Sequence, residues 1–229
     1  MQTKKIKAVA FDWDGVLYDS FEIYTAHLNT TLAFYGKPQI SLDDNRSKMS
    51  GPSVTETLRR CGIEAPDLEG ARQVFLELAR GKPEPPIFPD AHDTLRWLYD
   101  RSIMIFIISA HPEEDIKRLV DTYDLSTFIT GIRGGAGPVD KVSFIKNLLA
   151  EKKLAPEEMV FVDDMNEIVA LAENVGCWRI ASTRGFCSYE RLQAVRPDKV
   201  IRNLKGLQGF INLINHDELN RLKPSPPKT

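Results

Sequence analysis

Three short and almost uninterrupted apolar segments constrain the fold of this chain more than any other feature. They span residues 7–12, 103–109 and 159–162, and each has the length of a β-strand. Strands buried on both faces of a parallel sheet have this composition, whereas half-exposed strands alternate apolar and polar residues. The sequence therefore predicts a parallel sheet with a buried centre. Weaker candidates for further strands are 128–131, 177–181 and, at an edge, 199–201.

Helical patterns separate these strand candidates, at residues 90–100, 112–123, 142–152 and 166–175. Gly176 follows the last of them, as glycine commonly does at the end of a helix. Strands that alternate with helices of about 10–15 residues indicate βαβ units and a doubly wound parallel sheet. With 229 residues, 42% of them hydrophobic, the chain is large enough for such an α/β core and a smaller insert.

The alternation stops between residues 20 and 88, where no convincing strand pattern is present. Helical periodicity covers 21–35, 54–61 and 68–80 instead. The proline-rich stretch 82–86 is typical of a stiff linker that leads back to the core. The sequence therefore predicts an all-helical insert directly after the first strand.

The predicted organisation follows from these patterns. Residues 1–19 and 89–229 form the core, and residues 20–88 form the helical insert. The last seven residues, 223–229, are rich in proline and lysine, and we expect them to be disordered.

Polar side chains follow the predicted buried strands. Ligands of open α/β sheets bind beyond the carboxyl ends of the strands, so we expect these side chains to meet at one edge of the sheet. Separate strand ends have no structural need to be this polar, and their convergence indicates a functional site. The residues are Asp12, Asp14, Ser109, Asp163 and Asp164, together with Lys141, which lies just ahead of the helix that precedes the third apolar run.

These residue types suit phosphoryl transfer assisted by a metal ion. A carboxylate such as Asp12 can attack phosphorus and form an acyl phosphate that water then hydrolyses. Mg²⁺ prefers hard oxygen ligands, which Asp12 and Asp164 can supply. Asp14 can protonate the leaving-group oxygen and later deprotonate the water. We expect Ser109 and Lys141 to bind the phosphoryl oxygens and stabilise charge in the transition state.

The segment from Phe11 to Ser20, FDWDGVLYDS, closely resembles the first motif of the haloacid dehalogenase-like hydrolases. Ser109 is similar to their second motif, Lys141 to their third and residues 162–164 to their fourth, in matching order over most of the chain. The helical insert looks like the cap of the phosphoglycolate phosphatase-like branch. The resemblance implies a Rossmann-like core, a Mg²⁺ cofactor, an aspartyl-phosphate intermediate and a mobile cap. It also implies that Asp14 binds the metal through its backbone carbonyl.

Two positions depart from the family pattern. The fourth motif often has another acid four residues after the metal-binding aspartate, where this chain has Ile168. Glu167 or Asp163 is the alternative source of that acid. Asp164 is the predicted direct metal ligand, and Asp163 remains a second candidate. Lys141 is followed by valine rather than the proline common in phosphoglycolate phosphatases, which weakens the substrate analogy but leaves the phosphoryl-binding role.

Further candidates flank these motifs. Ala110, directly after Ser109, is placed with the substrate-binding residues. Arg46 lies in a segment of cations and glycine, residues 46–51, where a cap could meet the active site. It is a candidate substrate contact, with a solvated loop as the alternative. His111 is tempting as an acid or base, but a histidine at the rim of a site is more often a spectator.

Charge and composition exclude several other classes of function. The chain has 30 basic and 32 acidic residues and a formal net charge of −2, so no global basic field attracts nucleic acid or an anionic membrane. No apolar run reaches the roughly 18 residues of a membrane span, and no signal peptide is expected. The three cysteines lack metal-ligand spacing, and we expect reduced thiols in a cytoplasmic protein.

The sequence thus predicts a Mg²⁺-dependent phosphatase that hydrolyses a small phosphomonoester through phosphorylated Asp12. The candidate metabolites are of the phosphoglycolate, sugar phosphate or nucleotide type, and one sequence offers no code for the insert residues that select among them. Two alternatives remain open. A phosphomutase of the same fold would return the phosphoryl group to its product, and a non-catalytic binding module would be switched by phosphorylation of Asp12.

Overall fold

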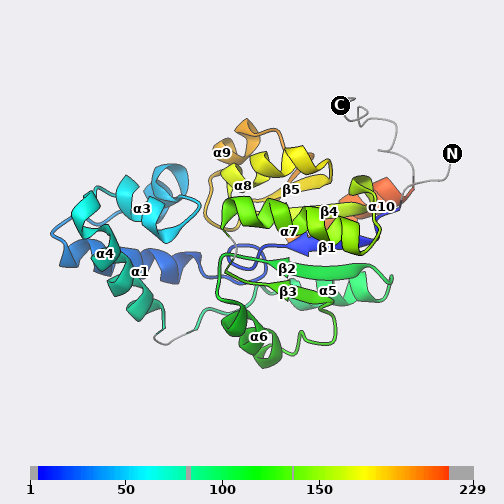
Figure 1. The fold of residues 1–229 in the computed structure, drawn as a ribbon, viewed down its shortest axis with the longest axis horizontal. Coiled ribbons are helices and arrows are strands. Elements are labelled where there is room, and N and C mark those ends of the chain that lie inside the picture. The colour runs from blue at the N-terminus through cyan, green and yellow to red at the C-terminus, as the bar shows by residue number, and fades with distance from the viewer. Residues whose placement is uncertain (1–4, 81–83, 136, 217–229) are drawn as a thin grey trace.

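A six-stranded parallel sheet forms the centre of the protein (Figure 1). The computed structural model describes residues 5–80, 84–135 and 137–216. The strand order is β3-β2-β1-β4-β5-β6, so the order reverses on either side of β1, as in a doubly wound Rossmann-like sheet. The strands are β1 (Ala8–Phe11), β2 (Met104–Ile108), β3 (Gly131–Arg133), β4 (Met159–Asp163), β5 (Trp178–Ser182) and β6 (Lys199–Ile201).

Helices cover both faces of the sheet and bury a hydrophobic cluster on each side. Two 3-10 turns, η3 (Pro156–Glu158) and η4 (Ala172–Val175), lie before β4 and before β5. One face carries α5 (Ala91–Tyr99), α6 (Glu113–Thr122) and α10 (Leu204–Asn215), and the other carries α7 (Pro138–Glu151), α8 (Asn166–Leu171) and α9 (Tyr189–Ala194).

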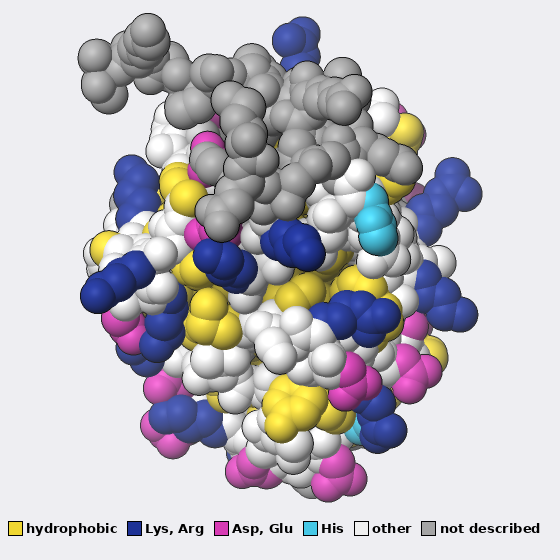
Figure 2. All heavy atoms as spheres, turned by 90° about the vertical axis from the view of Figure 1, so that its right-hand side faces the viewer, with side chains coloured by type: hydrophobic (Ala, Val, Ile, Leu, Met, Phe, Trp, Pro, Cys, Tyr) yellow, Lys and Arg dark blue, Asp and Glu magenta, His cyan; other side chains and the backbone are white. Residues whose placement is uncertain are grey.

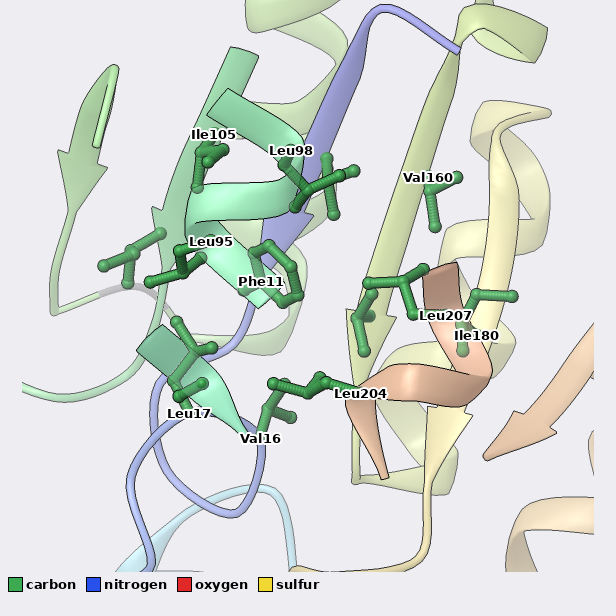
Figure 3. Close-up of a cluster of buried hydrophobic side chains, with 14 of the residues drawn as sticks. Phe11, Val16, Leu17, Leu95, Leu98, Ile105, Val160, Ile180, Leu204 and Leu207 are labelled. Carbon is green, nitrogen blue, oxygen red and sulfur yellow. The ribbon is translucent and has the colours of Figure 1, made fainter. Parts of the chain in front are cut away.

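Strand β1 explains why the central apolar runs are uninterrupted. Ala8 and Ala10 contribute to the cluster under α7 and α8, whereas Val9 and Phe11 contribute to the cluster under α5. Figure 3 shows Phe11 among leucines of α5 and α10 and the turn that follows β1. Because β1 is buried on both faces and paired on both edges, the residue that follows it, Asp12, is held in a fixed position.

Two sequence predictions on the core are wrong in detail. The strand expected at 128–131 begins only at Gly131, because Phe128 and Ile129 lie in a turn whose apolar side chains pack against the core. Helix α7 begins at Pro138 rather than at 142, so Lys141 lies in its first turn instead of ahead of it. Gly137 and Pro138 form that start, and proline is favoured at the first position of a helix.

The segment between β1 and α5 is helical and lies beyond the carboxyl end of β1 (Figure 1). In its described part no strand is present, and an isolated bridge joins Tyr18 to Ile87. Its elements bury a hydrophobic cluster of their own, which includes Leu28, Leu58 and Phe75. They are α1 (Phe21–Phe34), α2 (Leu42–Asp44), the π-helical turn η1 (Asn45–Met49), α3 (Val54–Arg60), the 3-10 turn η2 (Ala65–Asp67) and α4 (Leu68–Ala79).

Hydrogen bonds join this helical segment to α8 and α9 of the core. Arg191 donates to the carbonyl oxygen of Arg46 at 3.1 Å and to that of Ser50 at 3.0 Å. Arg60 donates to Oε1 of Glu167 at 3.0 Å. The segment therefore contacts the core on the side where β4 and β5 end. The expected disordered tail, 223–229, and the first residues of the expected linker, 82 and 83, lie outside the described residues.

The distribution of charged side chains on the surface agrees with the small net charge of the chain. On the face opposite the helical segment, basic and acidic side chains are interspersed (Figure 2). None of the described helices combines the length and the apolar composition needed to cross a membrane.

Candidate active site

The register of the sheet brings the predicted polar residues to one edge. Phe11 lies beside Ile107 of β2 and Val162 of β4. The next residue, Asp12, therefore lies between the ends of β2 and β4, and its backbone N–H donates to the carbonyl oxygen of Val162 at 2.9 Å. Ser109 follows β2 and Asp164 follows β4. Residues that are far apart in the sequence thus meet where three parallel strands end.

A buried lysine joins two of the carboxylates. Nζ of Lys141 lies 2.6 Å from Oδ2 of Asp12 and 3.0 Å from Oδ2 of Asp163, and the lysine side chain is 1% exposed. The backbone N–H of Trp13 donates to the other oxygen of Asp12 at 2.7 Å, and that of Met165 donates to the other oxygen of Asp163 at 2.8 Å. Each oxygen of these two carboxylates therefore accepts a hydrogen bond, which fixes the orientation of both groups.

Three buried carboxylates crowd together at this point, those of Asp12, Asp163 and Asp164. One oxygen of each lies within 4.8 Å of the others, so the group could hold a metal ion. Burial raises the pKa of Asp164 well above its ordinary value, and the charges of Asp163 and Asp12 raise it further. Burial also raises the pKa of Asp163, which the ammonium of Lys141 only partly offsets. With all three carboxylates ionised, the cluster would carry more negative charge than one lysine balances, which is why these pKa values are raised.

Lys141 is strongly held in its charged form. Burial lowers the pKa of its ammonium, but the charges of Asp12 and Asp163 outweigh burial, so the pKa lies above its ordinary value. The dipole of α7 disfavours a cation in the first turn of the helix. The negative charges of Asp12 and Asp163 compensate for the unfavourable helix dipole and for burial. This explains how a fully buried ammonium is tolerated in the first turn of α7.

Two glycines make room for Asp164. The backbone N–H of Phe186 donates to its Oδ2. A Cβ atom at Gly185 would lie 1.8 Å from the same oxygen, and a Cβ at Gly15 would lie 2.3 Å from it. Gly15 also has φ +71°, which favours glycine on conformational grounds. No hydrogen bond within the described residues engages Oδ1 of Asp164, so that oxygen is available to a ligand.

Asp14 lies just outside the buried cluster, in the turn that follows β1. Ser20 donates to its Oδ1 at 2.7 Å, and Nδ1 of His111 lies 3.1 Å from its Oδ2. The side chain is 27% exposed. Burial raises the pKa of Asp14, but the charge of His111 and the hydrogen bonds from His111 and Ser20 outweigh burial and leave the pKa below its ordinary value. Asp14 therefore borders both the buried carboxylates and solvent.

The loop after β2 presents Ser109 and His111. Ser109 is buried, and its Oγ accepts a hydrogen bond from the backbone N–H of His111 at 3.3 Å, while no acceptor among the described residues engages its hydroxyl hydrogen. Ala110 is exposed at the rim, where only its backbone can offer polar groups. The proximity of His111 to Asp14 is the site contact that sequence reasoning missed, because nothing in one sequence pairs residues so far apart.

Arg46 and Glu167 are the two predicted candidates that lie on the contact between the helical segment and the core. Nε of Arg46 donates to the carbonyl oxygen of Gly185 at 2.8 Å, and its guanidinium lies over the ring of Phe21 at 4.3 Å. Its Nη atoms have no hydrogen-bond partner among the described residues. Oε1 of Glu167 binds Arg60 and Arg191 instead of the acid cluster. The structure thus brings Asp163, and not Glu167, next to Asp164.

The sequence matches the family model of the haloacid dehalogenase-like hydrolases over residues 9–181. The chain belongs to this family. The match spans β1 to β5 and includes every strand end that contributes a residue to the site. It confirms the family predicted from the motifs, and together with the similar phosphatases below it confirms the class of enzyme, a phosphoric monoester hydrolase.

Similar proteins agree with that assignment. Phosphoglycolate phosphatase 1 of Pseudomonas aeruginosa is 29% identical over 217 residues, which cover 90% of this chain and 79% of that protein. The phosphoglycolate phosphatase of Synechococcus elongatus is 26% identical over 194 residues, which cover 84% of this chain and 91% of that protein.

Solved structures of family members have the same fold. A haloacid dehalogenase-like hydrolase from Bacteroides fragilis superposes with a TM-score of 0.78 at 24% identity, covering 89% of this chain and 100% of that chain. A family member from Streptococcus pneumoniae superposes with a TM-score of 0.75 at 22% identity, covering 90% and 98%. The α/β fold class predicted from the strand pattern is confirmed.

Proposed function

We propose that this protein is a Mg²⁺-dependent phosphatase that hydrolyses a small phosphomonoester, phosphoglycolate first among them, through a phosphorylated Asp12. The observation that carries the proposal is the carboxylate of Asp12 itself. It lies at the end of a buried central strand, fixed by Lys141 and a backbone N–H, and beside two further buried carboxylates. A fixed and desolvated carboxylate at the ligand-binding edge of the sheet is suited to nucleophilic attack.

The proposed reaction has two displacements at phosphorus. An oxygen of Asp12 forms a bond to phosphorus, and the bond between phosphorus and the leaving-group oxygen breaks. Water then attacks the phosphorus of the aspartyl phosphate, which releases inorganic phosphate and restores the carboxylate. Asp14 in its protonated form gives a proton to the leaving oxygen in the first step, and the resulting carboxylate, the form that His111 and Ser20 stabilise, takes a proton from the attacking water in the second.

The acid cluster fits a hard divalent cation. Three carboxylates face one ammonium, Asp163 is already engaged by Lys141, and Oδ1 of Asp164 is available. Asp12 and Asp164 would hold Mg²⁺, with the backbone carbonyl of Asp14 as a third ligand by analogy with the family. When bound, the ion supplies positive charge that offsets the repulsion between an anionic substrate and an anionic nucleophile.

Lys141 and Ser109 are the proposed phosphoryl-binding groups. The ammonium of Lys141 has a third N–H beyond those directed at Asp12 and Asp163, and the hydroxyl of Ser109 donates to no described residue. Charged and hydroxyl donors fixed in a buried site stabilise charge that develops on phosphoryl oxygens without reorganising. Their rigid positions support a binding role for both side chains.

We assign the helical segment, residues 20–88, as the cap that selects the leaving group, with residues 1–19 and 89–229 as the core. Arg46 reaches from the cap to Gly185, a residue that contacts Asp164, and no described residue binds its Nη atoms. Phosphoglycolate carries a carboxylate on its leaving group, and a guanidinium binds carboxylates through paired N–H groups. The names of the similar phosphoglycolate phosphatases support this substrate over sugar phosphates and nucleotides.

The decisive test compares two esters with and without the metal. We expect purified protein to release phosphate from phosphoglycolate with Mg²⁺, to lose that activity in EDTA and to regain it on readdition. We expect kcat/KM to be at least about tenfold lower for 2-hydroxyethyl phosphate, which lacks the carboxylate, because one charge-assisted contact is lost. Metal-independent release, or none from any phosphomonoester in a broad panel, contradicts the function. Isomerisation of a sugar phosphate without phosphate release would indicate a phosphomutase.

Gly185→Ala tests the placement of Asp164. The added methyl group would overlap its carboxylate, because a Cβ there lies 1.8 Å from Oδ2. We expect the Mg²⁺ concentration for half-maximal activity to rise about tenfold or more, as when groups that orient a metal ligand are lost. Gly209→Ala on α10 is the matched control, since nothing lies within 4 Å of a Cβ there. An unchanged Mg²⁺ requirement in Gly185→Ala would remove Asp164 from the proposed metal ligands.

A further inference from the structure

The contact between His111 and Asp14 has no role in the function proposed above. The two residues belong to different loops at the carboxyl edge of the sheet, one after β2 and one after β1. Nδ1 of His111 lies 3.1 Å from Oδ2 of Asp14, and the two side chains are 25% and 27% exposed. Both thus lie at the boundary between the buried carboxylates and solvent, where a leaving group would depart.

We propose that His111 is a positioning residue that holds the carboxylate of Asp14 in the orientation needed for proton transfer to the leaving group. The inference rests on the proposed function, because it requires Asp14 to be the acid and base of the reaction. His111 itself need not touch the substrate.

Asp14 needs such a partner because of where it lies. Asp14 lies in the turn that follows β1, in which the N–H of Gly15 donates to the carbonyl oxygen of Tyr18 at 2.9 Å. The side chain of Asp14 is not enclosed by the sheet. A partly exposed carboxylate on a turn has several staggered rotamers available. Ser20 fixes one oxygen of Asp14 and His111 fixes the other. With both bonds in place, the carboxylate has one orientation.

His111 is itself held firmly enough to serve as an anchor. Its backbone N–H donates to Oγ of Ser109 at 3.3 Å, and its carbonyl oxygen accepts from the N–H of Gly135 at 2.8 Å. The imidazole packs edge-on against the ring of Tyr18, with centroids 6.3 Å apart, and Tyr18 stacks on Trp13. The ring position is thus set by the same turn that carries Asp14.

The expected effect depends on the leaving group. Proton donation by Asp14 matters most when the departing oxygen is strongly basic, as in an alkyl phosphate such as phosphoglycolate. It matters little for 4-nitrophenyl phosphate, whose leaving group departs as a stable anion. The quantity kcat/KM reports the steps up to the first irreversible one, the transfer to Asp12. A loss in kcat/KM confined to the alkyl ester therefore reports on Asp14, whereas a general structural defect lowers both.

The experiment measures kcat/KM for both esters in His111→Ala and His111→Asn. For His111→Ala we expect a fall of roughly 10–100-fold with phosphoglycolate and less than about threefold with 4-nitrophenyl phosphate, as for other groups that orient a functional residue. His111→Asn retains an N–H donor near the position of Nδ1 and should recover most of the activity. His92→Asn on α5, where the imidazole packs against Phe128 away from the site, is the matched control.

A double-mutant cycle on phosphoglycolate separates this inference from the proposed function. If His111 acts through Asp14, adding His111→Ala to Asp14→Asn costs little more than Asp14→Asn alone. Equal losses for both esters in His111→Ala, or fully additive losses in the double variant, would overturn the positioning role. If Asp14→Asn itself shows no preference for the leaving group, the proposed acid role of Asp14 fails instead.

Discussion

We expect Asp12→Asn to lose essentially all phosphatase activity, a fall in kcat of at least about 10⁴-fold, because the variant lacks the attacking oxygen. The amide keeps the size of the carboxylate, and Lys141 keeps its ion pair with Asp163, so the fold should be retained. The measurement is phosphate release at saturating Mg²⁺, together with circular dichroism and a denaturant titration that verify the fold.

The matched control for Asp12→Asn changes an acid outside the cluster. Asp198 accepts a hydrogen bond from the backbone N–H of Arg179 at the far end of β5, away from the active-site edge. Asp198→Asn should therefore retain activity. If Asp12→Asn released phosphate at a rate close to that of the wild type, the covalent mechanism would be wrong.

Lys141→Met should damage both stability and activity. The substitution removes the cation that pairs with Asp12 and Asp163 and leaves three crowded, buried carboxylates with no ion pair to another described residue. Loss of one member of a buried ion pair typically costs about 3–5 kcal/mol in the free energy of unfolding. The methionine fills the space of the lysine stem, so the loss reports on charge rather than on a cavity. Denaturant unfolding at constant Mg²⁺ concentration measures it.

Lys146→Met provides the control on the same helix. Lys146 is exposed on α7, and its replacement should change the free energy of unfolding by no more than about 0.5 kcal/mol. Equal unfolding midpoints for the two variants would contradict the account of Lys141 as the charge that stabilises the acid cluster. An active Lys141→Met would also remove this residue from phosphoryl binding.

The sequence was sufficient for the parts of the site that follow from the central strands. A strand buried on both faces must be apolar throughout, so the runs that end at Asp12, Ser109 and Asp163 were visible as patterns. Parallel strands place their carboxyl ends on one edge, so the strand pattern alone predicts the convergence of these residues. Lys141 was also found, although its helix begins earlier than the periodicity indicated.

Other features depend on contacts that periodicity does not encode. The pairing of His111 with Asp14, and the close approach of Gly185 to Asp164, join loops that are far apart in the chain. Arg46 lies in a π-helical turn with its side chain bound to the core, and not in the solvated loop that was the alternative to substrate contact. Helix α10 is not among the predicted helices, although its buried residues follow helical spacing, namely Leu204, Leu207, Ile211 and Ile214.

The central claim is that Asp12 becomes phosphorylated during turnover, and trapping the intermediate tests it most directly. Rapid mixing of enzyme, Mg²⁺ and phosphoglycolate, followed by an acid quench and borohydride reduction, converts an aspartyl phosphate to homoserine, which mass spectrometry locates in the sequence. The account predicts homoserine at position 12 in the wild type and none in Asp12→Asn. Homoserine at another aspartate, or none at all during rapid phosphate release, would contradict it.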